Sequence, residues 1–161
     1  MIFVTTGSQK FQFNRLLRAV DNGIASGAID DEVFAQTGYS DYRPMNYSGV
    51  AFLDKQQFDE KMDACDILIT HAGTGAIIGA LKKGKKVIAM PRLRQFGEHV
   101  DDHQVQLLEQ FAEAGLILCC SDEAGLIDAY RRAKTREAVV FRSNNAIFLE
   151  DLDNYLSVHL G

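Results

Sequence analysis

Short hydrophobic runs rich in β-branched residues alternate along this chain with longer segments in which hydrophobic residues recur at helical spacing. The short runs are typical of strands buried in a parallel sheet, and the longer segments predict amphipathic helices. The expected strands cover residues 1–5, 32–36, 50–53, 67–70, 87–90 and 116–118. This alternation predicts an α/β fold with a Rossmann-like, doubly wound parallel sheet of about six strands.

Polar residues before the helical segments are the expected helix caps. They are Asn14, Thr74, Asp101 or Asp102, and Ser121. A last helix is expected from about Ser143. Because no repeat, low-complexity segment or linker divides the sequence, we expect residues 1–161 to form one domain.

Composition excludes several classes of protein. Hydrophobic residues make up 47% of the 161 residues, which argues against a disordered chain. The net charge of −5 argues against a nucleic-acid partner, which would need a basic surface. No apolar run approaches the roughly 20 residues that span a bilayer, and no signal peptide is apparent. The three cysteines lack metal-ligand spacing, so they are interpreted as reduced thiols of a cytoplasmic protein.

A group of basic residues follows the third predicted helix. Its members are Lys82, Lys83, Lys85 and Lys86, with Arg92 and Arg94 nearby. Cations suit a helix C-terminus, so a solvated helix end is the favoured interpretation. A surface for a membrane or an acidic partner is the alternative.

The first predicted strand ends in a loop that could bind phosphate. The loop contains Thr6, Gly7, Ser8 and Gln9. Backbone N–H groups, hydroxyl groups and a helix N-terminus all favour an anion at such a place. The loop matches neither G-x-G-x-x-G nor a Walker motif, and an ordinary strand-to-helix turn is an equally good account of it.

A second glycine-rich loop follows the strand at 67–70. It reads His71, Ala72, Gly73, Thr74 and Gly75, and it opens the third helix. Glycines there allow the backbone to approach a ligand closely. A single histidine is usually structural, but the carboxyl end of a parallel strand favours a site for His71.

Polar residues also gather before the fourth predicted helix. They are Glu98, His99, Asp101, Asp102, His103 and Gln104. Such groups can hydrogen-bond the hydroxyls of a sugar. His99 and His103 are four residues apart, but the sequence is not H-E-x-x-H, so no metal site is expected. A polar helix cap explains Asp101 or Asp102 but not the whole cluster.

Together these motifs resemble the C-terminal domain of glycosyltransferase family 28, and especially the stand-alone subunits of bacterial polysaccharide-biosynthesis enzymes. These subunits are similar to the catalytic subunit of the split eukaryotic transferase that extends dolichol-linked GlcNAc. The resemblance runs from Met1 to about Gly115. It is carried by His71–Gly75, by Asp102–Gln104 and by the loop Gly7–Gln9.

The resemblance implies the C-terminal, donor-binding half of a GT-B fold. It implies inverting sugar transfer from a UDP-sugar to a polyprenyl-diphosphate-linked glycan, without a cofactor or an essential metal. A membrane-anchored partner subunit would bind the acceptor and hold this chain at the inner face of the cytoplasmic membrane. Capsule or exopolysaccharide synthesis is the expected setting.

Site residues follow from the same resemblance. The diphosphate would contact Thr6, Gly7, Ser8, Gln9, Gly73, Thr74 and Gly75. The uracil would contact Phe52 and Leu53. The sugar would contact Glu98, Asp102, His103 and Gln104. His71 and Glu98 are the local candidates for the catalytic base, which could instead lie on the partner.

One position departs from the family pattern. The family often has Asp or Glu on the third helix to bind the ribose, whereas this chain has Gly79. The ribose contact must then come from elsewhere. Two further functions stay open: a non-catalytic nucleotide-binding regulator of a partner transferase, and a soluble enzyme acting alone on a small acceptor. The sequence fixes neither the sugar nor the polymer.

Overall fold

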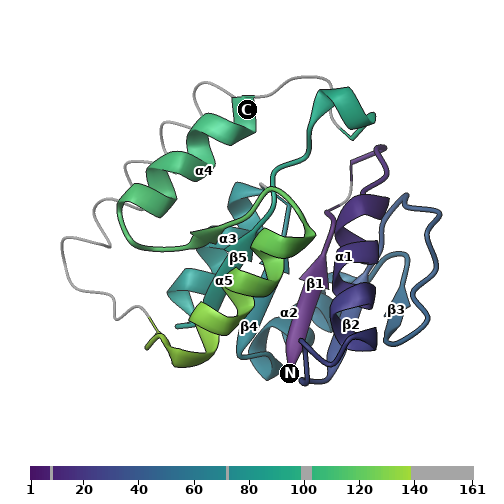
Figure 1. Ribbon diagram of the computed structural model, residues 1–161, viewed down its shortest axis with the longest axis horizontal. Coiled ribbons are helices and arrows are strands. Elements are labelled where there is room, and N and C mark those ends of the chain that lie inside the picture. Colours follow the sequence, from purple (N-terminus) through teal and green to yellow (C-terminus); the bar gives the residue numbers. More distant parts are fainter. Residues whose placement is uncertain (8, 72, 99–102, 139–161) are drawn as a thin grey trace.

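A parallel sheet forms the centre of the computed structural model, which describes residues 1–7, 9–71, 73–98 and 103–138. Its strands are β1 (Ile2–Thr5), β2 (Val33–Gln36), β3 (Ser48–Val50), β4 (Ile67–Thr70), β5 (Lys86–Ala89) and β6 (Leu118–Cys119). Their order is β3-β2-β1-β4-β5-β6, and all neighbours are parallel (Figure 1). The predicted doubly wound sheet is therefore confirmed.

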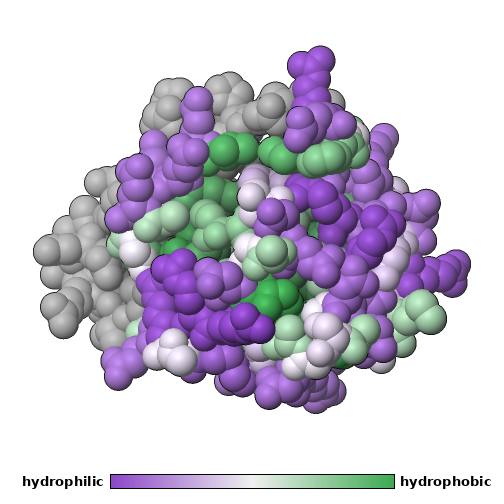
Figure 2. Space-filling view, in the orientation of Figure 1, coloured by the Kyte–Doolittle hydropathy of each residue, from purple (hydrophilic) through white to green (hydrophobic). Residues whose placement is uncertain are grey.

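Helices cover both faces of the sheet. They are α1 (Asn14–Ala25), α2 (Lys55–Ala64), α3 (Thr74–Lys82), α4 (His103–Glu113) and α5 (Glu123–Thr135), with a 3₁₀ turn η1 (Arg94–Phe96) before α4. Ile2 and Val4 of β1 pack with α1 and α5, whereas Phe3 packs with α2, α3 and α4. This two-sided burial explains why the strand sequences are hydrophobic throughout. The outer face seen in Figure 2 is mainly hydrophilic, with apolar groups gathered near its middle.

The third strand does not lie where the hydrophobic run 50–53 predicts it. β3 ends at Val50 and is exposed along its length, because it is an edge strand. After Val50 the chain turns toward α2, which Asp54 caps by accepting a hydrogen bond from the Gln57 N–H group at 2.8 Å. The apolar residue Phe52 therefore lies outside the sheet and is 47% exposed. The sixth strand is likewise displaced, from 116–118 to Leu118–Cys119.

Three predicted helix caps are wrong by one residue. Phe13 precedes α1, and its N–H group donates to the Ser40 hydroxyl at 2.8 Å, so Asn14 is the first helical residue. Gly73 precedes α3 in place of Thr74. Asp122, not Ser121, caps α5 by accepting from the Gly125 N–H group. The proposed caps Asp101 and Asp102 and the helix from Ser143 lie outside the described residues.

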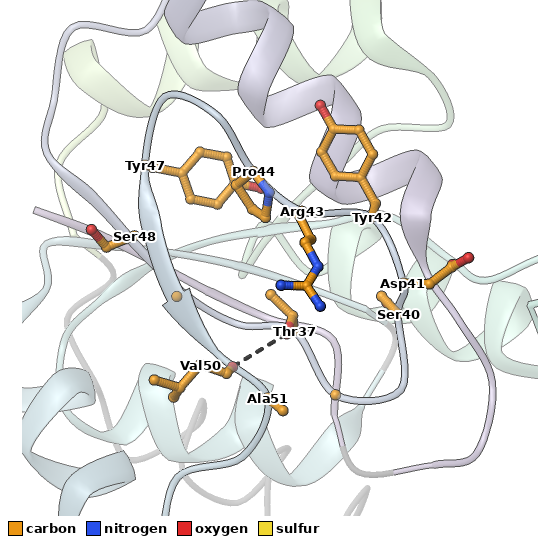
Figure 3. A pocket seen from close by; sticks show the side chains of 12 residues that line it. Thr37, Ser40, Asp41, Tyr42, Arg43, Pro44, Tyr47, Ser48, Val50 and Ala51 are labelled. Carbon is orange, nitrogen blue, oxygen red and sulfur yellow. Dashed lines mark hydrogen bonds between the residues drawn. The ribbon is translucent and has the colours of Figure 1, made fainter.

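A buried carboxylate holds the long loop between β2 and β3. Asp21 of α1 is 2% exposed and accepts hydrogen bonds from the Tyr42 hydroxyl and from the backbone N–H groups of Met45 and Asn46, at 2.7–2.8 Å. The loop closes where the Thr37 N–H group donates to the Val50 carbonyl at 2.9 Å. Between these two ties lies an open hollow of about 670 Å³ (Figure 3).

We predict that Asp21→Asn destabilises the fold by about 1–3 kcal/mol at pH 7, because buried donors lose a charged acceptor. Burial alone opposes ionisation, but the hydrogen bonds from Tyr42, Met45 and Asn46 outweigh it and hold the pKa of Asp21 below its ordinary 3.8. The stabilisation is therefore present above that value and is lost as the pH falls through the lower, folded-state pKa.

Urea unfolding at pH 7 and at acid pH would measure both effects. The matched control is Asp59→Asn, which changes an exposed carboxylate on α2. Equal free energies of unfolding for Asp21→Asn and the unchanged protein at pH 7 would contradict the assignment. So would a difference between them that does not shrink at acid pH.

Candidate functional site

A cleft of about 450 Å³ opens at the carboxyl edge of the sheet, where β1 lies beside β4. It gathers residues from the ends of β1, β2 and β4, from the segment before α2, and from the first turns of α2 and α3. Residues predicted for the site that line it are Gly7, Gln9, Phe52, Leu53, His71, Gly73 and Gly75. The structure thus brings together three segments that are far apart in the sequence. In doubly wound folds, ligands bind at this switch in strand order.

Polar side chains cross the floor of the cleft in register. Thr5 lies opposite Gln36 on one side and Thr70 on the other. The Gln36 side-chain amide donates to the Thr5 hydroxyl at 3.3 Å, and its oxygen accepts the Leu53 N–H group at 2.8 Å. Gln36 therefore fixes the segment of Phe52 and Leu53 relative to β1.

The segment after β1 is anchored to the end of β2 by Thr6. Thr6 is buried, and its hydroxyl and N–H groups donate to the Gln36 carbonyl at 3.2 and 3.1 Å. Gly7 follows with a φ of 78°, a backbone conformation that favours glycine. Thr6 thus does not line the cleft, whereas Gly7 and Gln9 do.

The imidazole of His71 lies between two glycines. A Cβ atom at Gly7 would lie 2.6 Å from its Cε1 and Nε2 atoms, and one at Gly73 would lie closer still. His71 Nδ1 lies 3.2 Å from the Thr70 hydroxyl, which holds the ring in this orientation. The glycines of both loops are therefore needed to make room for a ring that lines the cleft.

Helix α3 directs its N-terminus toward the cleft. Gly73 is its N-cap and supplies no side-chain hydrogen bond, and Gly75 in the first turn is exposed. The first-turn N–H groups carry the positive end of the helix dipole. This arrangement suits an anion, as predicted from the sequence. Thr74 lies in the same turn but does not line the cleft.

Aromatic side chains form the rim beside Leu53. Phe52 lines the cleft, and its ring meets Tyr39 edge to face at 5.2 Å. Both rings are about half exposed. An exposed aromatic pair beside a polar floor provides a surface on which a planar base could stack.

Glu98 does not line this cleft. Its carboxylate is 1% exposed and pairs with Arg15, at 3.0 Å to Nη2 and 3.1 Å to Nε. It also accepts the Leu93 N–H group at 3.0 Å. These contacts account for Glu98 as a structural residue, and its predicted roles toward a sugar or as a base stay predictions.

The remaining predicted residues are only partly described. Ser8 and Asp102 lie outside the described residues. His103 begins α4, and Gln104 follows in the same first turn. Their predicted sugar contacts are therefore neither supported nor contradicted.

Several lining residues were missed from the sequence. Gln36, Lys55 and Phe58 line the cleft. Gln36 carried a signal, because it is a polar residue that ends a buried strand at the expected ligand edge. Lys55 and Phe58 gave none, because they lie in the first turn of α2, and the hydrophobic run at 50–53 had been assigned to a strand.

The three cysteines all lie within the described residues and are unpaired. Burial raises the pKa of each thiol, to about 12 for Cys120. Within the same ranges no three His, Cys, Asp or Glu side chains gather as metal ligands. None of the described helices is both long and apolar enough to cross a membrane.

Comparison with known proteins identifies relatives in sequence. The family model described as "Glycosyltransferase family 28 C-terminal domain" matches residues 1–152. The UDP-N-acetylglucosamine transferase subunit ALG13 of Candida glabrata is 36% identical over 89 residues, which are 54% of this chain and 43% of that protein. The chain spans less than half the length of the relatives that it matches in sequence.

Solved structures share the fold. The NMR solution structure of ALG13 gives a TM-score of 0.58 at 24% identity, over 85% of this chain and 86% of that chain. The crystal structure of the kitacinnamycin glycotransferase gives 0.62 at 17% identity, over 99% of this chain and 40% of that chain. The second comparison therefore matches nearly all of this chain to less than half of a longer protein.

We predict that Gly73→Ala displaces the His71 ring and destabilises the fold by about 1–3 kcal/mol, the usual cost of overpacking a filled site. Gly75→Ala is the matched control, because its Cβ would meet no atom within 4 Å. It should leave His71 in place and stabilise the helix slightly. Thermal unfolding and NMR spectra of the imidazole protons would test this. Unchanged His71 resonances in Gly73→Ala would contradict the packing.

Proposed function

Because this chain belongs to the glycosyltransferase family 28 C-terminal domains, we propose that it binds a UDP-sugar and acts as the donor-binding half of a two-subunit, inverting glycosyltransferase. One observation carries the proposal. The cleft joins an aromatic rim to a loop with Gly7 and to the uncapped N-terminus of α3. A nucleoside diphosphate needs an aromatic surface for its base and, beside it, backbone N–H groups for its phosphates.

In the proposed complex the uracil stacks at Phe52. The Leu53 N–H group is already bonded to Gln36, so the Leu53 carbonyl is the group left to accept a hydrogen bond from the base. The diphosphate lies along the loop from Gly7 to Gln9 and along Gly73–Gly75, whereas the buried Thr6 supports that loop from the protein side. The sugar reaches Asp102, His103 and Gln104. Because the Candida glabrata relative is a UDP-N-acetylglucosamine transferase subunit, UDP-N-acetylglucosamine is the first donor to test.

The proposed reaction is a single displacement. The acceptor hydroxyl oxygen attacks the anomeric carbon, and the bond from that carbon to the β-phosphate oxygen breaks. UDP leaves with the bonding electrons. The N–H groups at the start of α3 stabilise the charge that develops on UDP, so the proposal requires no essential metal.

A base must accept the proton of the acceptor hydroxyl. Of the two candidates on this chain, His71 lines the cleft, whereas the Glu98 carboxylate is engaged by Arg15 and by the Leu93 N–H group. The geometry thus favours His71 among the residues of this chain. A base on the partner subunit is the competing assignment.

The acceptor half is proposed to be a membrane-anchored subunit that presents a polyprenyl-diphosphate-linked glycan. This chain would then lie at the inner face of the cytoplasmic membrane through that partner. Capsule or exopolysaccharide synthesis is the proposed setting, whereas the ALG13 relatives are named for UDP-N-acetylglucosamine transfer. The Lys82–Lys86 group lies around the amino ends of β4 and β5, at the opposite edge from the cleft. It therefore gives no support to direct membrane contact near the site.

Calorimetric titration of the full chain with UDP in the presence of EDTA tests the proposal first. We expect binding of UDP in preference to ADP and GDP, without added metal. UDP-N-acetylglucosamine, UDP-glucose, UDP-galactose and UDP-glucuronic acid would follow.

The co-expressed pair of subunits provides the second arm. Sugar transfer to a lipid-linked acceptor by the pair is the expected result. UDP binding without transfer by the pair would favour a regulatory subunit instead. Equal affinity for UDP, ADP and GDP, or absence of binding by both the chain and the pair, would exclude the donor site.

We predict that Gly79→Glu lowers the dissociation constant of UDP about tenfold, because a carboxylate bonded to ribose hydroxyls makes strong hydrogen bonds. A Cβ atom at Gly79 would meet no atom within 4 Å, so the side chain can be accommodated. Gly79→Gln is the matched control and should gain less. The gain should vanish with 2′-deoxy-UDP. Equal effects of the Glu and Gln variants, or weaker binding by both, would place the ribose elsewhere.

A further inference from the structure

A buried arginine joins two of the loops at the carboxyl edge. Arg92 follows β5 and is 1% exposed. Its guanidinium donates to the carbonyl oxygens of Thr6 and of Phe11 (at 2.7 Å), near both ends of the segment between β1 and α1. It also donates to the Glu98 carbonyl at 3.2 Å. Arg92 therefore fixes the segment that contains Gly7 against the segment that precedes α4.

A second arginine completes the connection from α1. Arg15 pairs with both carboxylate oxygens of Glu98 and donates to the carbonyls of Pro91 and Ser121, at 3.0 and 2.6 Å. The Phe13 ring lies 5.6 Å from the Arg15 guanidinium carbon and 5.2 Å from that of Arg92. We call Arg15, Arg92 and Glu98 the arginine bridge. Sequence reasoning had assigned Arg92 to a solvated basic group, because its partners are distant in the chain.

The arginine bridge carries one positive charge in excess, since it holds two guanidinium groups and one carboxylate. The Glu98 carboxylate is used by Arg15, and Arg92 is bonded only to carbonyl oxygens among the hydrogen bonds described. Its Nε atom is buried and has no acceptor within the described part of the chain. Burial lowers the pKa of Arg92 to about 10, against the opposing effect of Glu98, so the group stays protonated at neutral pH.

We infer that Arg92 is a positioning residue of the donor site. Arg92 fixes the Thr6–Gly7 turn, and its buried positive charge attracts the diphosphate that binds at this turn. The inference rests on the proposed function only for the identity of the nucleotide. The prediction that the site binds an anion is independent of it. An interior charge is poorly screened by water, so it acts on a bound anion more strongly than a surface lysine would. Arg15 supports this effect, because it pairs with the Glu98 carboxylate and offsets that negative charge.

The test is calorimetric titration of the full chain with inorganic pyrophosphate, UDP and uridine. Arg92→Met should weaken pyrophosphate and UDP binding about tenfold and leave uridine within about twofold, because only the first two carry phosphate. Arg92→Lys keeps the charge and should recover part of the loss. Arg15→Met leaves Glu98 to neutralise Arg92, so it should show the same selective loss even where Arg92→Met does not fold. Arg18→Met, which removes an exposed arginine from the same helix, is the matched control.

The outcomes separate this inference from the proposed function. Wild-type binding of pyrophosphate without preference for UDP over ADP would reject the proposed nucleotide and leave the role of Arg92 standing. UDP binding that is unchanged in Arg92→Met and Arg15→Met would reject the role of Arg92 and leave the proposed function standing. Equal losses for UDP and uridine would show a structural effect only and overturn the inference, as would a wild-type chain that binds no pyrophosphate.

Discussion

The site depends on one topological constraint, the adjacency of β1 and β4 in a parallel sheet. The chain leaves β1 toward α1 on one face and leaves β4 toward α3 on the other. Two neighbouring strands whose helices diverge leave a crevice that no side chain from either helix fills. Thr5 and Thr70 lie opposite each other at that point, so Gly7 and Gly73 enter the cleft together and enclose the His71 ring.

Buried charges fix the irregular segments around this crevice. Loops lack the repeating hydrogen bonds of a sheet, so their backbone groups need other partners when they are covered. Arg92 supplies donors to the segments after β1 and before α4, and Asp21 plays the corresponding part for the neighbouring loop between β2 and β3, to which it supplies acceptors. Each charge is stabilised by backbone groups of the opposite polarity. The cleft is thus bounded by segments held in place before any ligand arrives.

The sequence predicted what local periodicity determines. The strand at Ile67–Thr70 and the two glycine loops follow from short buried runs and their endings, and the structure has them there. β3 was misplaced because edge exposure cannot be read from a hydrophobic run. The roles of Arg92 and Glu98 were missed because their partners lie 86 and 83 residues away, at Thr6 and Arg15. Polar contacts between residues far apart in the chain produce no periodic pattern of residue types, so they cannot be predicted from the spacing of residues in a sequence.

The proposed chemistry makes a specific demand on charge. UDP gains negative charge as it leaves, and without a metal that charge must be balanced by groups of the protein. The N-terminus of α3 offers about half a positive charge, which is well short of a divalent ion. In the proposed site, the excess charge of the arginine bridge would add to it through Arg92, which is bonded to the Thr6 carbonyl. The helix N-terminus and the arginine bridge are both fixed by the fold, so neither group needs to reorient during the proposed reaction. In the proposed two-subunit enzyme, the donor half would therefore supply this stabilisation whichever acceptor the partner presents.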